Sequence, residues 1–305
     1  MDAQVATTER PAAAPVSDIT AVETYVAPRS LAEALELLRA GDVTILAGGT
    51  DLMPQSKTGK ARFQRMLMNI QRMHELRGIT EEKNFVRFGA LTTITELLDS
   101  AMVKSRFRAL WESADHFASD QLRNAATIGG NICNASPAGD TLVPLLVFNA
   151  RVVLASKKGA AVATRTLPLS EFFVAPGRTQ RQPGELLTAV EVPLPPNDFV
   201  SEYFKFGTRP ALDISTIAIG LGAVRSGDRL TDVRLAFGAL APTPIRAPKT
   251  EAALNGKPLV DAIEAALAAA ELEINPISDI RASAWYRREL VHNLLRRMLD
   301  RVGKH

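Results

Sequence analysis

The sequence is poor in the side chains that bind metals. Among its 305 residues there is one cysteine, Cys133, and there are four histidines. A single cysteine excludes an internal disulfide, and it excludes a multi-cysteine iron–sulfur cluster or zinc site made by this chain alone. The histidines form no pair at the helical spacing of a metal site; they are His74, His116, His292 and His305. If the chain does redox work, it therefore needs an organic cofactor.

Long apolar runs and blocks of like charge are also missing. No stretch approaches the ~20 apolar residues of a membrane helix. Lys plus Arg is 36 and Asp plus Glu is 33, a net charge of only +3. The nearest basic cluster, residues 287–288 with 296–297, lies on a helical pattern whose charged side should face solvent. We therefore expect no membrane span and no nucleic-acid partner.

Residues 1–20 are rich in Ala, Pro, Thr and Val and lack a basic start followed by an apolar run. This composition favours a disordered lead over a strap that lies on a partner, and it is not typical of a secretory signal. The cytoplasm is the expected compartment.

Apolar spacing and capping signals predict mixed helices and strands up to about residue 196. Helices are expected between Ser30 and Gly41, at 93–98 and at 103–118. Strands are expected at 43–47, 85–89 and 151–155. The small and polar run 119–140 is expected to be a long loop, and a folded loop of this length is usually functional.

Prolines at positions 193, 195 and 196 predict a boundary, and the pattern changes beyond it. Strands are expected at 203–207, 214–224 and 233–240, followed by helices at 260–272 and 284–302. Strands followed by helices are typical of an α+β module.

A first glycine pair follows directly on the strand at 43–47. Because glycine has no Cβ, the backbone N–H groups of Gly48 and Gly49 can approach the oxygens of a diphosphate. Thr50 adds a hydroxyl donor, and Asp51 can accept from a cofactor hydroxyl or brace the loop. Taken alone, the pair is better explained as a plain glycine turn.

A second glycine pair, Gly129 and Gly130, lies in the polar run between Thr127 and Asn131. Two separated pairs could hold one diphosphate from both sides. No Gly-x-Gly-x-x-Gly follows the first strand, which disfavours a Rossmann domain.

Three motifs in this order resemble the FAD-binding medium subunit of the xanthine dehydrogenase and carbon monoxide dehydrogenase family. They are Leu-Ala-Gly-Gly-Thr-Asp-Leu at 46–52, Ala-Thr-Ile-Gly-Gly-Asn at 126–131 and Ala-Ser-Pro-Ala-Gly-Asp at 135–140. The resemblance covers nearly the whole chain beyond its N-terminal lead. It implies an α+β fold, with a two-lobed FAD-binding domain of the vanillyl-alcohol-oxidase (PCMH) type and a C-terminal α+β domain of antiparallel sheet plus helices. The chain is expected to divide into a disordered N-terminal lead at 1–20, a first FAD-binding lobe at 21–75, a second FAD-binding lobe at 76–196 and the C-terminal domain at 197–305.

The resemblance also implies which residues contact FAD. The first lobe would wrap the pyrophosphate with Ile45, Leu46, Ala47, Gly48, Gly49, Thr50, Asp51 and Leu52. The second lobe would hold it with Thr127, Gly129, Gly130, Asn131 and Asp140. Phe117, Leu187 and Lys205 also fall at family contact positions.

Several of these positions have a plainer explanation. Phe117 and Leu187 fit core packing, Lys205 fits a surface position, and Asp140 could cap the following helix. The segment 212–214 is expected near the flavin ring, where the carbon monoxide branch carries an aromatic residue and this chain has Ile214.

The family implies a division of labour among subunits. A large subunit oxidises the substrate at a molybdenum–pterin cofactor, and a small subunit with two [2Fe–2S] clusters carries the electrons to FAD, which passes them to NAD, oxygen, a quinone or another external acceptor. We predict that this chain is the FAD-binding electron-transfer subunit, with no catalytic residue for the organic substrate, in a dimer of heterotrimers. Relatives with an inserted four-cysteine [4Fe–4S] loop are a poor match, because the chain is short between residues 131 and 140.

Two alternatives stay open at this point. A stand-alone flavin oxidase would need acid–base residues in its third domain, and no convincing set is present. A scaffold that had lost FAD would not need its glycine pairs. We expect valine at Gly48 or Gly129 to empty the site while the chain still folds.

Overall fold

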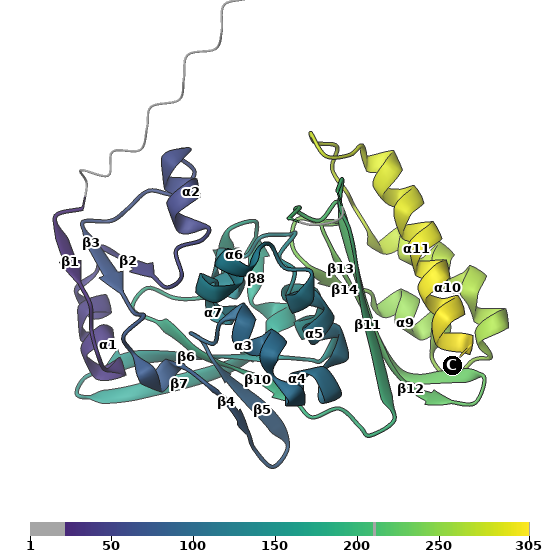
Figure 1. Cartoon of the computed structure of the whole chain (residues 1–305), viewed down its shortest axis with the longest axis horizontal. Helices are drawn as coiled ribbons and strands as arrows, with labels where there is room; N and C mark the ends of the chain where they lie inside the picture. The colour runs from purple at the N-terminus through teal and green to yellow at the C-terminus, as the bar shows by residue number, and fades with distance from the viewer. Residues whose placement is uncertain (1–21, 210–211, 305) are drawn as a thin grey trace, which may run out of the picture.

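The computed structural model describes residues 22–209 and 212–304, whose elements form three groups along the long axis of the molecule (Figure 1). The first group is a three-stranded parallel sheet with two helices. Its elements are β1 (Thr24–Val26), α1 (Leu31–Ala40), β2 (Val43–Leu46), α2 (Leu52–Lys57) and β3 (Met66–Asn69). The strand order is β1-β3-β2.

The second group is a five-stranded antiparallel sheet of order β4-β5-β10-β6-β7, with short helices and a small hairpin. The strands are β4 (Ile79–Glu81), β5 (Phe85–Gly89), β6 (Arg151–Lys158), β7 (Ala161–Pro168) and β10 (Leu186–Pro193), with β8 (Phe173–Ala175) and β9 (Arg178–Thr179) forming the hairpin. The helices are α3 (Ile94–Asp99), α4 (Ala101–Arg106), α5 (Arg108–Asp115), α6 (Asp120–Ala125), α7 (Ile128–Asn134) and α8 (Leu142–Val147). Short 3₁₀ turns span His74–Leu76 and Leu169–Glu171.

The third group is a four-stranded antiparallel sheet followed by helices, as the strand-then-helix pattern predicted. Its elements are β11 (Phe199–Phe206), β12 (Ile217–Ser226), β13 (Arg229–Gly238), β14 (Ile245–Arg246), α9 (Pro248–Leu254), α10 (Leu259–Glu273) and α11 (Ala284–Lys304). The α+β fold class is therefore confirmed. The domain boundaries drawn from the sequence stay predictions.

The capping signals in the sequence mark the starts of two helices correctly. Ser30 Oγ accepts from Glu33 N at the start of α1, which ends at Gly41 with φ of +83°. At α3, Thr93 and Glu96 form both bonds of a capping box. Each cap satisfies a backbone donor that the first helical turn leaves without a partner.

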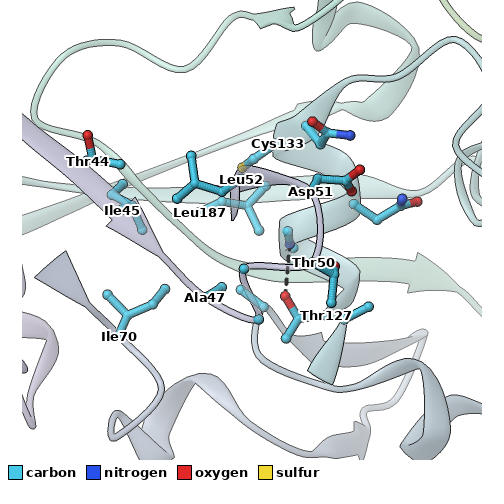
Figure 2. Close-up of a pocket in the computed structure, with 18 of the residues that line it drawn as sticks. Thr44, Ile45, Ala47, Thr50, Asp51, Leu52, Ile70, Thr127, Cys133 and Leu187 are labelled. Carbon is cyan, nitrogen blue, oxygen red and sulfur yellow. Dashed lines mark hydrogen bonds between the residues drawn. The ribbon is translucent and has the colours of Figure 1, made fainter. Parts of the chain in front are cut away.

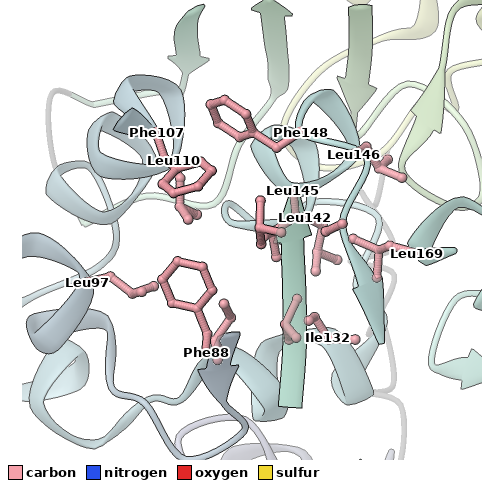
Figure 3. Packing of buried hydrophobic residues seen from close by; sticks show 14 of the residues in the cluster. Phe88, Leu97, Phe107, Leu110, Ile132, Leu142, Leu145, Leu146, Phe148 and Leu169 are labelled. Carbon is pink, nitrogen blue, oxygen red and sulfur yellow. The ribbon is translucent and has the colours of Figure 1, made fainter. Parts of the chain in front are cut away.

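One predicted helix is divided in two. The expected helix at 103–118 is broken at Phe107, which has φ of −129° and ψ of 55°. The Phe107 ring is fully buried between Phe88 and Phe148, with ring centroids 6.1 and 5.1 Å away in edge-to-face geometry (Figure 3). Core packing at this position thus accompanies a change of chain direction that periodicity alone did not predict.

The run at 119–140 is not the long loop expected from its composition. It contains α6 and α7, each started by a side-chain cap from Ser119 or Thr127. Ile128 and Ile132, one turn apart on α7, are fully buried in the main core. Burial of these two side chains outweighs the poor helix propensity of the glycines and asparagine between them.

The C-terminal sheet packs on helices at both faces. Ile217, Ile219 and Leu221 of β12 belong to the core shared with α9–α11, whereas the alternate positions face α8. A Cβ built at Gly222 would lie 2.6 Å from Val147 Cγ1 of α8, so glycine allows the helix to approach the sheet closely. This packing joins the third group to the second.

Candidate cofactor site

A cavity of about 620 Å³ lies between the first and second groups of elements, and we call it the interlobe cavity. Its walls come from the β2–α2 loop, α7, the β8–β9 hairpin and the start of β10. Figure 2 shows Thr50, Thr127 and Leu187 among the residues that line it. Its size lies within the ~300–1,000 Å³ range of small-molecule and cofactor sites. Of the 16 predicted contact residues, 13 line it: Ile45, Ala47, Gly48, Gly49, Thr50, Asp51, Leu52, Phe117, Thr127, Gly129, Gly130, Asn131 and Leu187.

The β2–α2 loop presents backbone donors to this cavity. Within the described residues, the N–H groups of Gly48, Gly49 and Thr50 donate to no protein oxygen. Gly49 has φ of +73°, a left-handed conformation that favours glycine. Gln71 Nε2 donates to Ala47 O at 2.9 Å and braces the loop. The loop therefore offers fixed, unused N–H groups of the kind that bind phosphate oxygens.

Gly48 also lies at a point of close contact between the two groups of elements. A Cβ built on it would lie 1.9 Å from Ala125 O, far inside van der Waals contact. Helices α2 and α7 are joined nearby by a bond of 2.9 Å from Gln55 Nε2 to Asn134 Oδ1. Glycine at position 48 thus serves close packing as well as access to the backbone.

The second glycine pair has a different role from the one the sequence suggested. Gly130 N donates to Thr127 Oγ1 at 3.0 Å (the dashed line in Figure 2), and Gly129 N donates to Ala90 O at 2.9 Å. Both N–H groups are therefore used inside the protein, although both residues line the cavity. The Thr127 hydroxyl accepts from Gly130 and keeps its own proton to donate.

The structure contradicts the expectation that valine at these glycines spares the fold. A Cβ at Gly129 would lie 2.7 Å from Ala90 O and 2.8 Å from Ala90 Cβ, and Ala90 is buried. Together with the contact at Gly48, this means that either substitution strains the backbone packing.

Two titratable groups in the cavity wall have raised pKa values. Burial raises the pKa of Asp51, and the positive charge of Lys60 partly offsets this. Its carboxylate neither caps α2 nor braces the loop, which leaves it able to accept from a ligand hydroxyl. Burial also raises the pKa of the Cys133 thiol to about 11, with Arg181 opposing the shift. Cys133 is therefore a neutral thiol near pH 7.

Three predicted contact residues do not line the cavity: Leu46, Asp140 and Lys205. Lys205 Nζ lies 2.8 Å from Asp140 Oδ2 in a pair with both side chains nearly buried. Asp140 Oδ1 also accepts from Tyr203 Oη at 3.1 Å and from Ser215 Oγ at 3.0 Å. Asp140 does not cap α8, whose N-cap is the next residue.

This buried cluster holds the C-terminal sheet against the cavity wall. Burial raises the pKa of Asp140, and its bonds and charge pairing with Lys205 oppose the rise. Lys205 Nζ also lies 3.3 Å from His116 O, next to the cavity residue Phe117. The cluster therefore joins β11 to the segment that carries Phe117.

The sequence reasoning missed several polar residues in the lining: Gln55, Arg62, Asn134, Arg178 and Arg181. Three of them are arginines, and Asp51 is the only acid among the described lining residues, so the wall carries a net positive charge. A signal was present in residues 176–181, where a Pro-Gly turn is followed by two arginines. A dinucleotide with two phosphates fits this wall by size, by charge and by the donors that the β2–α2 loop offers.

Two family models cover most of the chain. Residues 18–195 match the FAD binding domain in molybdopterin dehydrogenase, and residues 202–302 match the CO dehydrogenase flavoprotein C-terminal domain. The chain belongs to this flavoprotein family. It is thus a FAD-binding medium subunit of the xanthine and carbon monoxide dehydrogenase type, an oxidoreductase subunit, as the three motifs predicted.

Curated relatives agree over nearly full length. The chain is 34% identical over 280 residues to the xanthine dehydrogenase FAD-binding subunit of Escherichia coli O157:H7, which covers 90% of this chain and 94% of the relative. It is 35% identical over 281 residues to the glyceraldehyde dehydrogenase medium chain of Sulfolobus acidocaldarius. This match covers 92% of this chain and 98% of the relative.

Solved structures show the same arrangement. A chain of carbon monoxide dehydrogenase from Oligotropha carboxidovorans superposes with a TM-score of 0.87 at 30% identity, covering 93% of this chain and 98% of that one. A chain of the Hydrogenophaga pseudoflava enzyme superposes with a TM-score of 0.85 at 33% identity, covering 90% of this chain and 95% of that one. Within residues 22–209 and 212–304, no helix combines the length and apolar character required to cross a bilayer.

Proposed function

We propose that this medium subunit takes electrons from [2Fe–2S] clusters of a partner subunit and passes them to an external acceptor. The partners would be a large subunit with a molybdenum–pterin cofactor and a small iron–sulfur subunit, in a dimer of heterotrimers. The observation that carries the proposal is the interlobe cavity, which has unused backbone donors at Gly48, Gly49 and Thr50 in a chain that matches the FAD-binding family model. The acceptor and the location in the cytoplasm stay predictions.

The cavity residues would bind and orient FAD. The unused N–H groups of Gly48, Gly49 and Thr50 and the Thr127 hydroxyl would donate to phosphate oxygens. The Asp51 carboxylate can accept from a cofactor hydroxyl. When bound, FAD supplies a redox centre that this chain's own side chains lack.

The apolar lining would help to keep water from the cofactor. Leu187, which is 3% exposed, and Ile70, also 3% exposed, contribute apolar surface to the wall from β10 and the end of β3. Phe117 adds aromatic surface from the turn after α5. Exclusion of water strengthens the electrostatic interactions of the bound group.

An exposed apolar segment spans the connection between α10 and α11 and the start of α11. Ile277 is 66% exposed, Ile280 98% and Trp285 68%, all within a ten-residue segment. Exposed large apolar side chains clustered in this way mark interaction sites, and aromatic residues are enriched in interface cores. We propose that this segment contacts a permanent partner in the complex.

The partner surface can be tested by substitution. Ile280→Asp should lower recovery of the other subunits in co-purification and leave the FAD content unchanged, because the segment does not line the cavity. Val260→Asp is a matched control, since Val260 is 81% exposed at the opposite end of α10. Equal recovery of the complex with Ile280→Asp and wild type would argue against this surface.

The function as a whole is tested by purification from the native source. We expect a yellow complex in which this chain carries FAD and co-purifies with subunits that contain molybdenum and iron, measured by visible spectroscopy and metal analysis. A yellow chain that purifies alone and turns over a substrate would favour a stand-alone oxidase. A colourless chain would refute the proposal.

A further inference from the structure

The β8–β9 hairpin brings two arginines to the wall of the interlobe cavity. Gly177 has φ of +71°, a left-handed conformation in the turn, and Arg178 and Arg181 follow it closely. Gly177 N donates to Ala135 O at 3.1 Å, which ties the hairpin to the end of α7. Arg181 Nη1 donates to Glu185 O at 2.9 Å, so its guanidinium is held in place.

Within residues 22–209 and 212–304 no carboxylate forms an ion pair with either arginine, although the charge of Arg181 helps to lower the pKa of the nearby Glu185. The nearby carboxylate of Glu185 is bound by Arg165, with Nε to Oε1 at 2.6 Å and Nη2 to Oε2 at 2.8 Å. Glu185 also accepts from Gln182 N at 2.7 Å. In the described part of the chain, Arg178 and Arg181 form no ion pair. Their positive charge is therefore available to a ligand.

The second lobe offers few other donors to an anion. The N–H groups of Gly129 and Gly130, in the glycine pair nearest to the hairpin, are bonded to Ala90 O and Thr127 Oγ1. Arginine binds phosphate with short, charge-assisted and often bidentate hydrogen bonds, which are roughly twice as strong as neutral ones. An anionic group in this cavity would thus find its strongest donors on that side in the hairpin.

We propose that Arg178 and Arg181 bind the diphosphate of FAD from the second lobe and make the cavity selective for a dinucleotide over a flavin without phosphate. This inference rests on the proposed function, because it requires FAD in the interlobe cavity. One negative charge on each phosphate complements the surplus of arginine over acid in the lining. Arg178 is exposed and Arg181 is half-buried, so solvent screening makes Arg181 the stronger contributor.

The test measures binding of three probes to the full-length apoprotein: FAD, ADP and riboflavin. Titration calorimetry should show that Arg181→Ala raises the Kd for FAD and for ADP by about tenfold or more, equivalent to ~1.4 kcal/mol. The Kd for riboflavin, which has no phosphate, should change less than about twofold. Arg181→Lys keeps the charge but not the bidentate geometry, so it should recover part of the loss.

Arg297→Ala is the matched control. Arg297 is an exposed arginine of α11 outside the cavity lining, so its removal changes net charge without touching the site. It should bind all three probes like wild type.

Two results would overturn the inference. One is an Arg178→Ala/Arg181→Ala double variant that binds FAD and ADP as tightly as wild type. The other is an equal loss of riboflavin binding, which would mean that the arginines shape the cavity and do not recognise phosphate. A wild-type chain that binds no FAD would refute the proposed function itself, so the two failures are distinguishable.

Discussion

Replacing Gly48 by alanine tests whether the contact between the two lobes sets up the cofactor site. The added Cβ would lie 1.9 Å from Ala125 O and 2.7 Å from Ala125 C. Both are backbone atoms, so no side chain can rotate away to relieve the clash. The β2–α2 loop must move away from the second lobe, and the N–H groups of Gly49 and Thr50 must move with it.

The size of the effect follows from the nature of this contact. Overpacking in a well-packed interior costs about 1–3 kcal/mol, and a clash with rigid backbone belongs at the upper end. For a domain of ~150–250 residues, each kcal/mol lowers Tm by about 2–4 °C, so we expect a fall of about 6–12 °C. The FAD content should fall as well, because the displaced loop carries the phosphate donors.

Gly159→Ala is the control for this variant. Gly159 has φ of +60° and no atom within 4 Å of an added Cβ, so alanine there costs only the left-handed backbone conformation, about 1–2 kcal/mol. Thermal denaturation and the ratio of flavin to protein absorbance should separate the two, since only Gly48→Ala should lose FAD. Wild-type Tm and full FAD content in Gly48→Ala would refute the reasoning.

Three further predictions concern the cavity and its surroundings. Gln55→Ala removes the bond to Asn134, worth about 0.5–1.5 kcal/mol, and should speed FAD release up to about tenfold in a fluorescence assay. Lys205→Met leaves the buried Asp140 without its cation, which raises the pKa of Asp140 further. The protein should lose about 3–5 kcal/mol of stability above neutral pH, where the carboxyl is charged. The loss should shrink in acid, where the carboxyl is protonated, and Tm measured against pH follows it. Since the pKa of Cys133 is raised to about 11, its alkylation by iodoacetamide should be slow near pH 7 and rise steeply toward pH 11, as followed by mass spectrometry.

Each of these predictions has a control. Gln121→Ala removes an exposed glutamine on α6 outside the cavity and should not change FAD release. Adding Asp140→Asn to Lys205→Met should remove the pH dependence, and a pH-independent loss in the single variant would contradict the role of this pair. For Cys133, rapid alkylation of the folded protein at neutral pH would contradict the raised pKa.

The sequence predicted the elements whose signals are local. Side-chain caps mark the starts of α1 and α3, at Ser30 and at Thr93 with Glu96, and a left-handed glycine, Gly41, marks the end of α1. These signals depend only on near neighbours in the chain. The first glycine pair was likewise placed correctly in a cavity wall, because it directly follows a buried strand.

Long-range packing explains what the sequence did not reveal. Phe107 breaks a regular helical pattern where its ring meets Phe88 and Phe148, residues distant in the chain. The polar run that contains Thr127 becomes helical because Ile128 and Ile132, one turn apart, are buried in the core. Neither outcome depends on local propensity alone.

Within the site, the sequence reasoning did not find the two arginines that we propose as anion donors on the second lobe. Gly129 and Gly130 attract attention as a motif, yet their N–H groups are bonded inside the protein. Arg178 and Arg181 reach the cavity from a hairpin far along the chain. The Pro-Gly turn before them is a local signal for a turn, but their position at the cavity depends on tertiary structure.

The bond between Gln55 and Asn134 has a consequence for how the holoprotein is made. It links α2 to α7 beside the cavity, at the place where the backbone of Gly48 already abuts Ala125. A dinucleotide that contacts both lobes would be held by groups on either side of these contacts, so motions that separate the lobes would also loosen it. The flavin could then be loaded into the folded chain at a rate set by how often the two lobes part.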